Sequence, residues 1–191
     1  MNFTDSNVAM FRFINDLSKQ HEYLNPIFEF LAEYMVYFLG VALLLSWFTG
    51  TNKNRIMVMN AAFALVIAEI GGKIAGMFYS NYQPFAELKN VNLLIEKGVN
   101  NSFPSDHTII FFSICFSFWL MRKKEGSLLL ILAVLVALSR IWVGVHYPAD
   151  VAAGALLGIL SALLAYRVVP RFSFIKRLTM AATEKDRSKT F

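Results

Sequence analysis

The stretch SLLLILAVLVALSRIWVGVHYPADVAAGALLGILSALLAYRVV, residues 127–169, decides the fold of this chain. It holds two apolar runs, 127–145 and 148–169, each close to the roughly 20 residues that cross a lipid bilayer as a helix. The short link between them carries His146, and Asp150 lies just after the start of the second run. The stretch therefore predicts a helical hairpin in a membrane, with ionisable side chains at its turn.

Three more apolar runs precede this hairpin, at 26–48, 56–79 and 105–121. The chain of 191 residues is 57% hydrophobic and 16% charged, with a mean hydropathy of +0.51, which is far more apolar than a soluble domain. Residues 8–20 have helical periodicity with mixed charge but too little apolar length to span, which favours a helix on the membrane surface. We predict an all-α integral membrane protein, a single domain over 1–191, with an N-terminal interfacial helix and five transmembrane helices.

The Lys and Arg residues near the ends of the spans predict the orientation, because cationic loops stay in the cytoplasm. One set of ends carries Lys53, Arg55, Arg122, Lys123, Lys124, Arg167, Arg171 and the basic tail 176–191. The opposite set carries Arg12, Lys19, Lys89 and Lys97 together with several acids. We expect a multi-pass protein of a bacterial plasma membrane, with a cytoplasmic C-terminus and the loop 80–104 outside. The net charge of +5 then reflects topology rather than a nucleic-acid partner.

Polar residues that are costly inside a membrane gather at the outer end, on four different helices. They are Lys73, Ser105, Asp106, His107, Arg140, His146 and Asp150. A proline before a helix followed by Ser105 leaves free backbone N–H groups at a positive helix end, which suits a phosphate. Lys73 and Arg140 would add charge on the phosphate oxygens. The cluster therefore predicts a phosphate site just below the external headgroups.

The order of these residues is specific. Phe103-Pro104-Ser105-Asp106-His107 is followed by Ser139-Arg140, five residues, His146, three residues and Asp150, and Lys73 precedes the pair Pro84-Phe85. This pattern resembles the type-2 phosphatidic acid phosphatase superfamily, and the short chain with its Pro-Ser-Asp-His form is similar to the undecaprenyl-diphosphate phosphatases of the bacitracin-resistance type. The resemblance implies hydrolysis of undecaprenyl diphosphate to undecaprenyl phosphate and inorganic phosphate at the outer face, which recycles the carrier lipid and gives bacitracin tolerance. The catalytic motifs fall within 73–150.

The chemistry of two histidines fits this reaction. His146 would be the nucleophile, with Asp150, one helical turn later, holding the ring and supporting its positive charge. His107 would donate a proton to the leaving oxygen as a phosphohistidine forms, and then accept one from the attacking water. The three histidines show no ligand spacing for a metal, so we expect neither a metal nor another cofactor.

Two departures from the superfamily pattern concern the phosphate site. Gln83 stands where the superfamily usually has an arginine, after a longer gap from Lys73, so one cationic ligand is missing or supplied elsewhere. Asp106 replaces a glycine, and we expect its carboxylate to point away from the phosphate, near the positive end of its helix. Ser139 and Glu69 are further candidates for the site.

Some residues keep two interpretations. Glu69 could form a structural ion pair with Lys73 or position that lysine for phosphate. Residues 100–102 favour a turn over a phosphate contact, and 91–97 could be a lid or a packed connection. Glu29 and Glu33 could line the mouth of the site or be solvated, whereas Gly154 and Gly158 favour close helix packing.

Alternative functions also remain at this stage. The same chemistry could act on phosphatidylglycerol phosphate or phosphatidic acid. A lipid transporter is disfavoured because the charges cluster at one face rather than at the midplane. An inactive lipid-binding scaffold is disfavoured by the presence of both histidines. The expected partners are a polyprenyl diphosphate substrate and membrane lipids, and the oligomeric state is left open.

Overall fold

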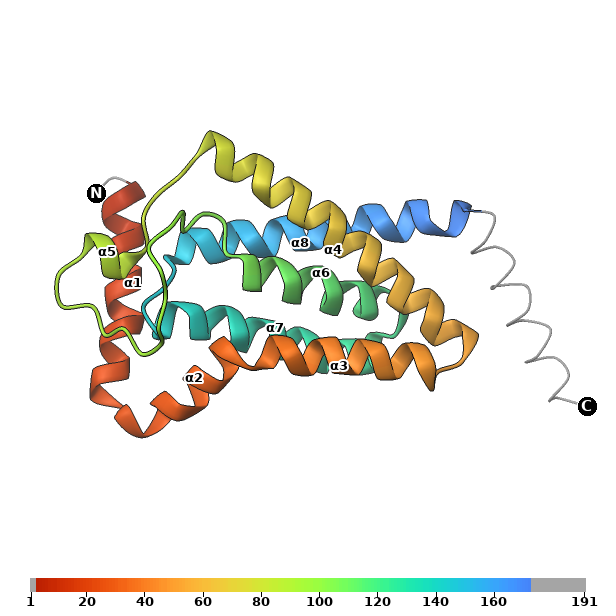
Figure 1. Cartoon of the computed structure of the whole chain (residues 1–191), viewed down its shortest axis with the longest axis horizontal. Coiled ribbons are helices and arrows are strands. Elements are labelled where there is room, and N and C mark those ends of the chain that lie inside the picture. The colour runs from red at the N-terminus through yellow and green to blue at the C-terminus, as the bar shows by residue number, and fades with distance from the viewer. Residues whose placement is uncertain (1–2, 173–191) are drawn as a thin grey trace, which may run out of the picture.

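Helices make up most of residues 3–172, the part of the chain that the computed structural model describes (Figure 1). In chain order they are α1 (Phe3–Gln20), the 3-10 turn η1 (Glu22–Leu24), α2 (Asn25–Glu33), α3 (Met35–Phe48), α4 (Asn52–Phe78), α5 (Pro84–Glu87), α6 (Asp106–Met121), α7 (Lys123–Trp142), α8 (Pro148–Val168) and the 3-10 turn η2 (Val169–Arg171). The predicted tail 176–191 lies outside the described residues.

Helix α6 lies at the centre of the bundle and packs against α4, α7 and α8. Gly154 and Gly158 of α8 allow a close contact with α6. A Cβ atom at Gly154 would lie 2.8 Å from the carbonyl oxygen of Ser105, and one at Gly158 would lie 2.8 Å from the backbone nitrogen of Ser113. The predicted packing role of the two glycines is therefore confirmed.

Within residues 3–172, three helices are long and apolar enough to cross a membrane: α4, α7 and the continuous unit Pro148–Arg171. Segments Glu22–Glu33 and Met35–Phe48 pass the same test only together, and they are bent by 47°. The segment predicted over 26–48 is therefore divided into two helices, α2 and α3, which meet at Tyr34. The all-helical, multi-pass fold is confirmed with three to four candidate spans, and α6 falls below the length of a standard span.

A buried arginine lies at this bend. Arg140 of α7 donates a hydrogen bond from Nη1 to the carbonyl oxygen of Ala32, at 2.6 Å, and Ala32 belongs to the last turn of α2. Carbonyl groups in the last turn of a helix lack partners within the helix, so a cation is favourable there. The bend in the first span is thus tied directly to a residue of the predicted site.

Helix α1 lies across one end of the bundle, as Figure 1 shows, and it extends the predicted surface helix 8–20 to Phe3–Gln20. Buried Asn15 donates to the carbonyls of Asn92 at 2.9 Å and Trp142 at 2.8 Å, and it accepts from the N–H of Asn92. Asn7 accepts a hydrogen bond from the N–H of Ala149. Helix α1 therefore fixes both the long loop and the turn between α7 and α8.

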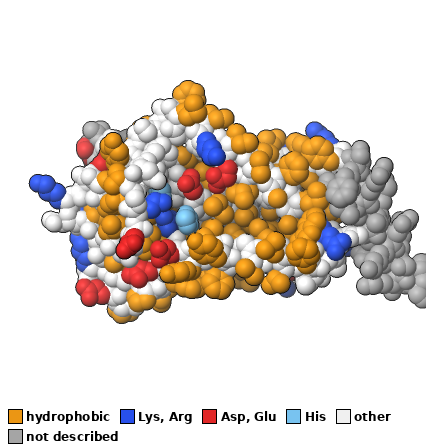
Figure 2. All heavy atoms as spheres, in the orientation of Figure 1, with side chains coloured by type: hydrophobic (Ala, Val, Ile, Leu, Met, Phe, Trp, Pro, Cys, Tyr) orange, Lys and Arg blue, Asp and Glu red, His pale blue; other side chains and the backbone are white. Residues whose placement is uncertain are grey.

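The two ends of the bundle differ in character. The α3–α4 loop, the α6–α7 junction and the end of α8 lie at one end, whereas α1, α5, the long loop and the α7–α8 turn lie at the other (Figure 1). Between them the visible surface is largely hydrophobic, while acidic, basic and histidine side chains gather on the α1 side of that face (Figure 2). The site residues lie at this second end.

Candidate active site

The long loop between α4 and α6 is held together by its own polar side chains. Gln83 is buried and donates to the carbonyl of Gly98 and to Oδ1 of Asn100, while its Oε1 accepts from the N–H of Asn100 at 3.0 Å. Tyr82 and Asn101 pair as an isolated bridge, and Asn81 accepts a hydrogen bond from the N–H of Ser102. The turn predicted for residues 100–102 is thus fastened to the start of the loop.

These loop contacts place Ser102 between His146 and Asp150, the two members of the predicted catalytic pair. Its Oγ lies 2.6 Å from Oδ2 of Asp150 and 3.1 Å from Nδ1 of His146. His146 and Asp150 are 3.7 Å apart, which is longer than a hydrogen bond. The expected His146–Asp150 contact therefore runs through Ser102, whose hydroxyl donates to the carboxylate and can accept from the N–H at Nδ1.

Backbone hydrogen bonds also hold His146 and Asp150 in place. The N–H groups of Val145 and His146 both donate to the carbonyl of Arg140, and the N–H of Ser105 donates to the carbonyl of Asp150. Gly144 has a φ of +88°, and a Cβ there would lie 2.7 Å from the carbonyl oxygen of Asn92, so glycine is required in this turn. With Nδ1 directed at Ser102, Nε2 is the ring nitrogen of His146 left for an incoming group.

His146 lies in the turn between α7 and α8, where only 5% of its surface is exposed. Burial lowers its pKa below the usual 6.5. Asp150 partly offsets this shift, whereas the positive charges of Arg140 and Lys97 add to it. The imidazole is therefore neutral at neutral pH, which is the form that a nucleophile needs.

His107 and Arg140 complete the inner part of the site. His107, on the first turn of α6, is half-buried and lies close enough to His146, Arg140 and Lys97 for their charges to act on it. Arg140 is 2% exposed, and its Nε has no hydrogen-bond partner among the described residues. Nη1 of the guanidinium is thus bound to Ala32, whereas Nε remains a buried donor without a partner in the described residues.

Two predicted charged residues lie nearer the mouth of the site. Lys73 is exposed on α4, and its charge acts on Glu69, one turn earlier. Asp106 is exposed at the start of α6 and lies within electrostatic range of Glu69, Lys97 and Arg140. The charge of Asp106 therefore acts on the cations of the site. Glu69 keeps one buried carboxylate oxygen without a hydrogen-bond partner in the described part of the chain.

Three further candidates have local structural partners. Ser105 precedes α6. Its Oγ accepts a hydrogen bond from the hydroxyl of Thr108 at 3.0 Å, and its N–H donates to the backbone carbonyl of Asp150. The Ser139 hydroxyl donates to the carbonyl of Val136, at 2.6 Å, within its own helix. Gln83 holds the loop rather than facing the histidines. Of the predicted set, His146 and Asp150 share the hydroxyl of Ser102, and the charge of Arg140 acts on both histidines.

The alternatives for the loop and for the acids of α2 are also resolved in part. Ile95 is buried with Val143 and Val145, and Leu94 packs against the same cluster, so residues 91–97 form a packed connection. Glu33 is exposed, and its charge acts on Arg140 from the α2 side.

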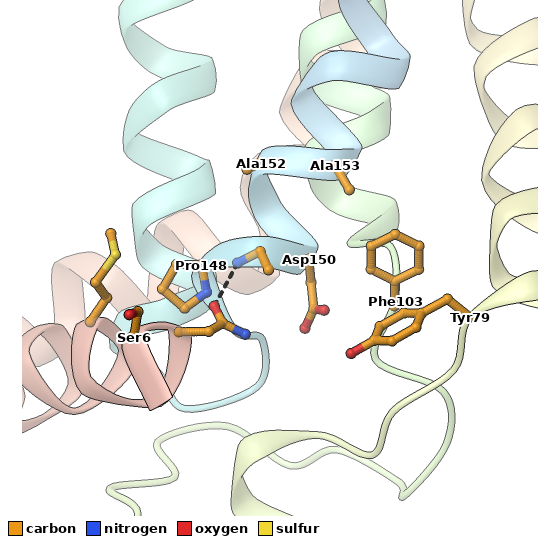
Figure 3. Close-up of a pocket in the computed structure, with 10 residues that line it drawn as sticks. Ser6, Tyr79, Phe103, Pro148, Asp150, Ala152 and Ala153 are labelled. Atoms are coloured by element: carbon orange, nitrogen blue, oxygen red, sulfur yellow. Dashed lines mark hydrogen bonds between the residues drawn. The ribbon is translucent and has the colours of Figure 1, made fainter. Parts of the chain in front are cut away.

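A largely apolar cavity of about 540 Å³ adjoins Asp150. Figure 3 shows it between the start of α8, the α1 residue Ser6, and the rings of Tyr79 and Phe103. Ala152 and Ala153 also line it. Apolar surface beside buried polar groups is the environment that a lipid phosphate needs.

Sequence reasoning assigned no site role to Ser102 beyond a turn or a phosphate contact, and none to Lys97. The partners of Ser102 lie 44 and 48 residues away, so no local spacing reveals them. The one indication in the sequence was Gln83, which stands where the superfamily pattern has an arginine and so implied that another residue supplies the cation.

A buried and a half-buried histidine, with a Ser–Asp support and adjoining cations at one end of a membrane bundle, define a class of membrane-embedded phosphatase. A model of the PAP2 superfamily matches residues 57–174. The chain belongs to the PAP2 superfamily, which confirms the resemblance found in the motifs.

Individual relatives cover most of the chain. It is 59% identical over 178 residues to the "Bacitracin transport permease protein BcrC" of Bacillus licheniformis, covering 93% of this chain and 88% of that one. It is 31% identical over 161 residues to the "Undecaprenyl-diphosphatase BcrC" of Bacillus subtilis, covering 84% and 83%. The crystal structure of Aquifex aeolicus LpxE superposes with a TM-score of 0.73 and 29% identity, over 84% of this chain and 94% of that one.

Proposed function

We propose that this protein hydrolyses undecaprenyl diphosphate to undecaprenyl phosphate and inorganic phosphate, and thereby gives tolerance to bacitracin. The observation that carries the chemistry is Ser102 between His146 and Asp150, because this arrangement leaves Nε2 of the buried His146 as the nucleophile. The substrate is supported by the relative from Bacillus subtilis, which is named an undecaprenyl-diphosphatase.

The proposed reaction has two steps. Nε2 of His146 attacks the terminal phosphorus, the bond from that phosphorus to the bridging oxygen breaks, and His107 gives its proton to the leaving undecaprenyl phosphate. His107 then takes a proton from water, which attacks the phosphohistidine and releases inorganic phosphate. Arg140 stabilises charge on the phosphoryl oxygens, and Asp150 supports the imidazolium through Ser102.

The proposed membrane arrangement has five crossings, of which α6 is the third along the chain and the shortest. Sixteen residues of α-helix reach about 24 Å, which is less than the hydrocarbon thickness of about 30 Å. The length is sufficient for α6 because it is surrounded by α4, α7 and α8, so its ends contact protein rather than lipid. Five crossings and the basic loops at the opposite end favour an extracytoplasmic site and a cytoplasmic C-terminus.

The discriminating experiment compares lipid substrates. Purified protein in detergent is given undecaprenyl diphosphate, phosphatidylglycerol phosphate and phosphatidic acid in parallel, and phosphate release is measured. We expect the highest kcat/KM for undecaprenyl diphosphate. A higher kcat/KM for a phospholipid monoester would show that this lipid is the substrate and would contradict the proposal.

A transport function deserves a direct comparison, because the relative from Bacillus licheniformis is named a transport permease. Phosphate release in detergent, where no gradient exists, distinguishes hydrolysis from transport. Absence of release from all three lipids would favour the transporter.

A further inference from the structure

One cation in the site is not explained by the superfamily motifs. The two histidines are both acted on by the charges of Arg140 and Lys97. Lys97 lies on the long loop, outside the helices, and it is half-buried. The predicted phosphate ligand Lys73 acts instead on Glu69.

The backbone on both sides of Lys97 is anchored. On one side, the N–H of Leu94 donates to the carbonyl of Val143 at 3.2 Å, and Ile95 is buried beside Val145, next to the nucleophile. On the other side, Gln83 holds the carbonyl of Gly98 and the backbone of Asn100. Lys97 is thus kept beside His146 by contacts at both of its flanks.

The electrostatics of this position favour an anion. Burial and the positive charge of Arg140 lower the pKa of Lys97, and Asp106 only partly opposes this. Two cations held close together repel each other, and Arg140 also keeps a buried Nε without a partner among residues 3–172. A phosphoryl group near both would relieve the repulsion and offer acceptors to both donors.

We propose that Lys97 binds the phosphate of the substrate and supplies the cation that Gln83 does not. Gln83 then has a different role from the arginine of the superfamily pattern: its amide fastens the loop that presents Lys97. The inference rests on the proposed phosphatase function of the site, and it deepens that function by assigning a substrate-binding residue.

The test compares Lys97→Gln and Lys97→Arg with Lys89→Gln, which makes the same charge change at an exposed position of the same loop. Losing one charged hydrogen bond to phosphate should lower kcat/KM by about 10- to 100-fold in Lys97→Gln. Lys97→Arg should keep most of the activity, and Lys89→Gln should match the wild type.

A second readout uses inorganic phosphate alone, titrated calorimetrically into each purified protein. Binding should weaken in Lys97→Gln and persist in the other two variants. Phosphate binding by Lys97→Gln that equals the wild type, or an equal loss of binding in Lys97→Arg, would overturn the proposal.

The two proposals can fail separately. Wild type that ignores undecaprenyl diphosphate but cleaves another lipid phosphate contradicts the proposed substrate, and Lys97 is then tested on that lipid. If no lipid is cleaved, the phosphate titration alone decides the role of Lys97.

Discussion

Ser102 shows how a single hydroxyl can orient the ring of the proposed nucleophile, His146. It bridges Nδ1 of His146 and Oδ2 of Asp150, which are too far apart to bond directly. The carboxylate accepts a second hydrogen bond from the N–H of Tyr147, at 2.9 Å, so it is fixed in place. The imidazole is thereby held in one orientation, with Nε2 free.

Removing this hydroxyl should slow the chemistry. We expect Ser102→Ala to lower kcat about tenfold with little change in KM, because the ring loses its hydrogen-bonded support. Ser117→Ala is the matched control, since Ser117 is also buried but bonds only within α6. Steady-state phosphate release measures both variants, and equal rates in the two would show that Ser102 has no special role.

The protonation of His146 gives a second test at the residue scale. Because burial lowers its pKa, the ring stays neutral as the pH falls through 6.5 and takes up a proton only below that value. Nitrogen-15 chemical shifts of labelled histidines in detergent, assigned with the His146→Ala variant, should give a midpoint below 6.5. A midpoint at or above 6.5 would contradict the buried, neutral nucleophile.

The sequence motifs pointed to some residues of the site, whereas residues that reach the site only through the path of the loop were missed. His107, Arg140, His146 and Asp150 are carried by helix ends whose order in the sequence is specific. Ser102 and Lys97 lie on an irregular loop, whose path depends on side-chain bonds to Gln83 and on α1. No periodicity reports such contacts, so only the structure could identify these residues.

At the scale of elements, the contact between α6 and α8 positions the two histidines, one near the start of each helix. Gly158 is central to it, since an added Cβ would lie 2.8 Å from the Cβ of Phe112 and from the backbone of Ser113. Gly158→Ala should therefore destabilise the bundle by about 1–3 kcal/mol.

Gly40→Ala in α3 is the control for Gly158, because nothing lies within 4 Å of its added Cβ. It should leave stability unchanged or raise it slightly, since alanine favours helix more than glycine does. Thermal unfolding in detergent compares the two variants. Equal melting temperatures would mean that the α6–α8 contact tolerates a larger residue.

The positions of the helices could be predicted from the sequence, but one helix boundary could not. The apolar runs located α2 with α3, α4, α6, α7 and α8, because membrane spans have a strong compositional signal. The break at Tyr34 was missed, since no proline or glycine marks it and its partner Arg140 is more than 100 residues away.

At the scale of the whole molecule, the distribution of charge predicts an orientation. Exposed Lys89 belongs to the end that carries the site, and exposed Lys124 to the opposite end. The single native cysteine, Cys115, is buried and should give little background. In intact spheroplasts, a membrane-impermeant maleimide should label Lys89→Cys, and Lys124→Cys only after permeabilisation. The reverse pattern would place the site in the cytoplasm.

Metal independence is a further prediction for the whole protein, because Arg140 and the lysines can neutralise the phosphoryl charge. Dialysis against EDTA should leave phosphate release unchanged. Loss of activity that added divalent ions restore would show that a metal takes part.

The central claim is that His146 attacks the phosphorus. Its most direct test is phosphate release from undecaprenyl diphosphate by wild type and by His146→Ala, both purified from the membrane and shown to be folded. The account predicts steady release by wild type and a loss of at least about 1,000-fold in the variant. A variant that retains a rate close to wild type would contradict it.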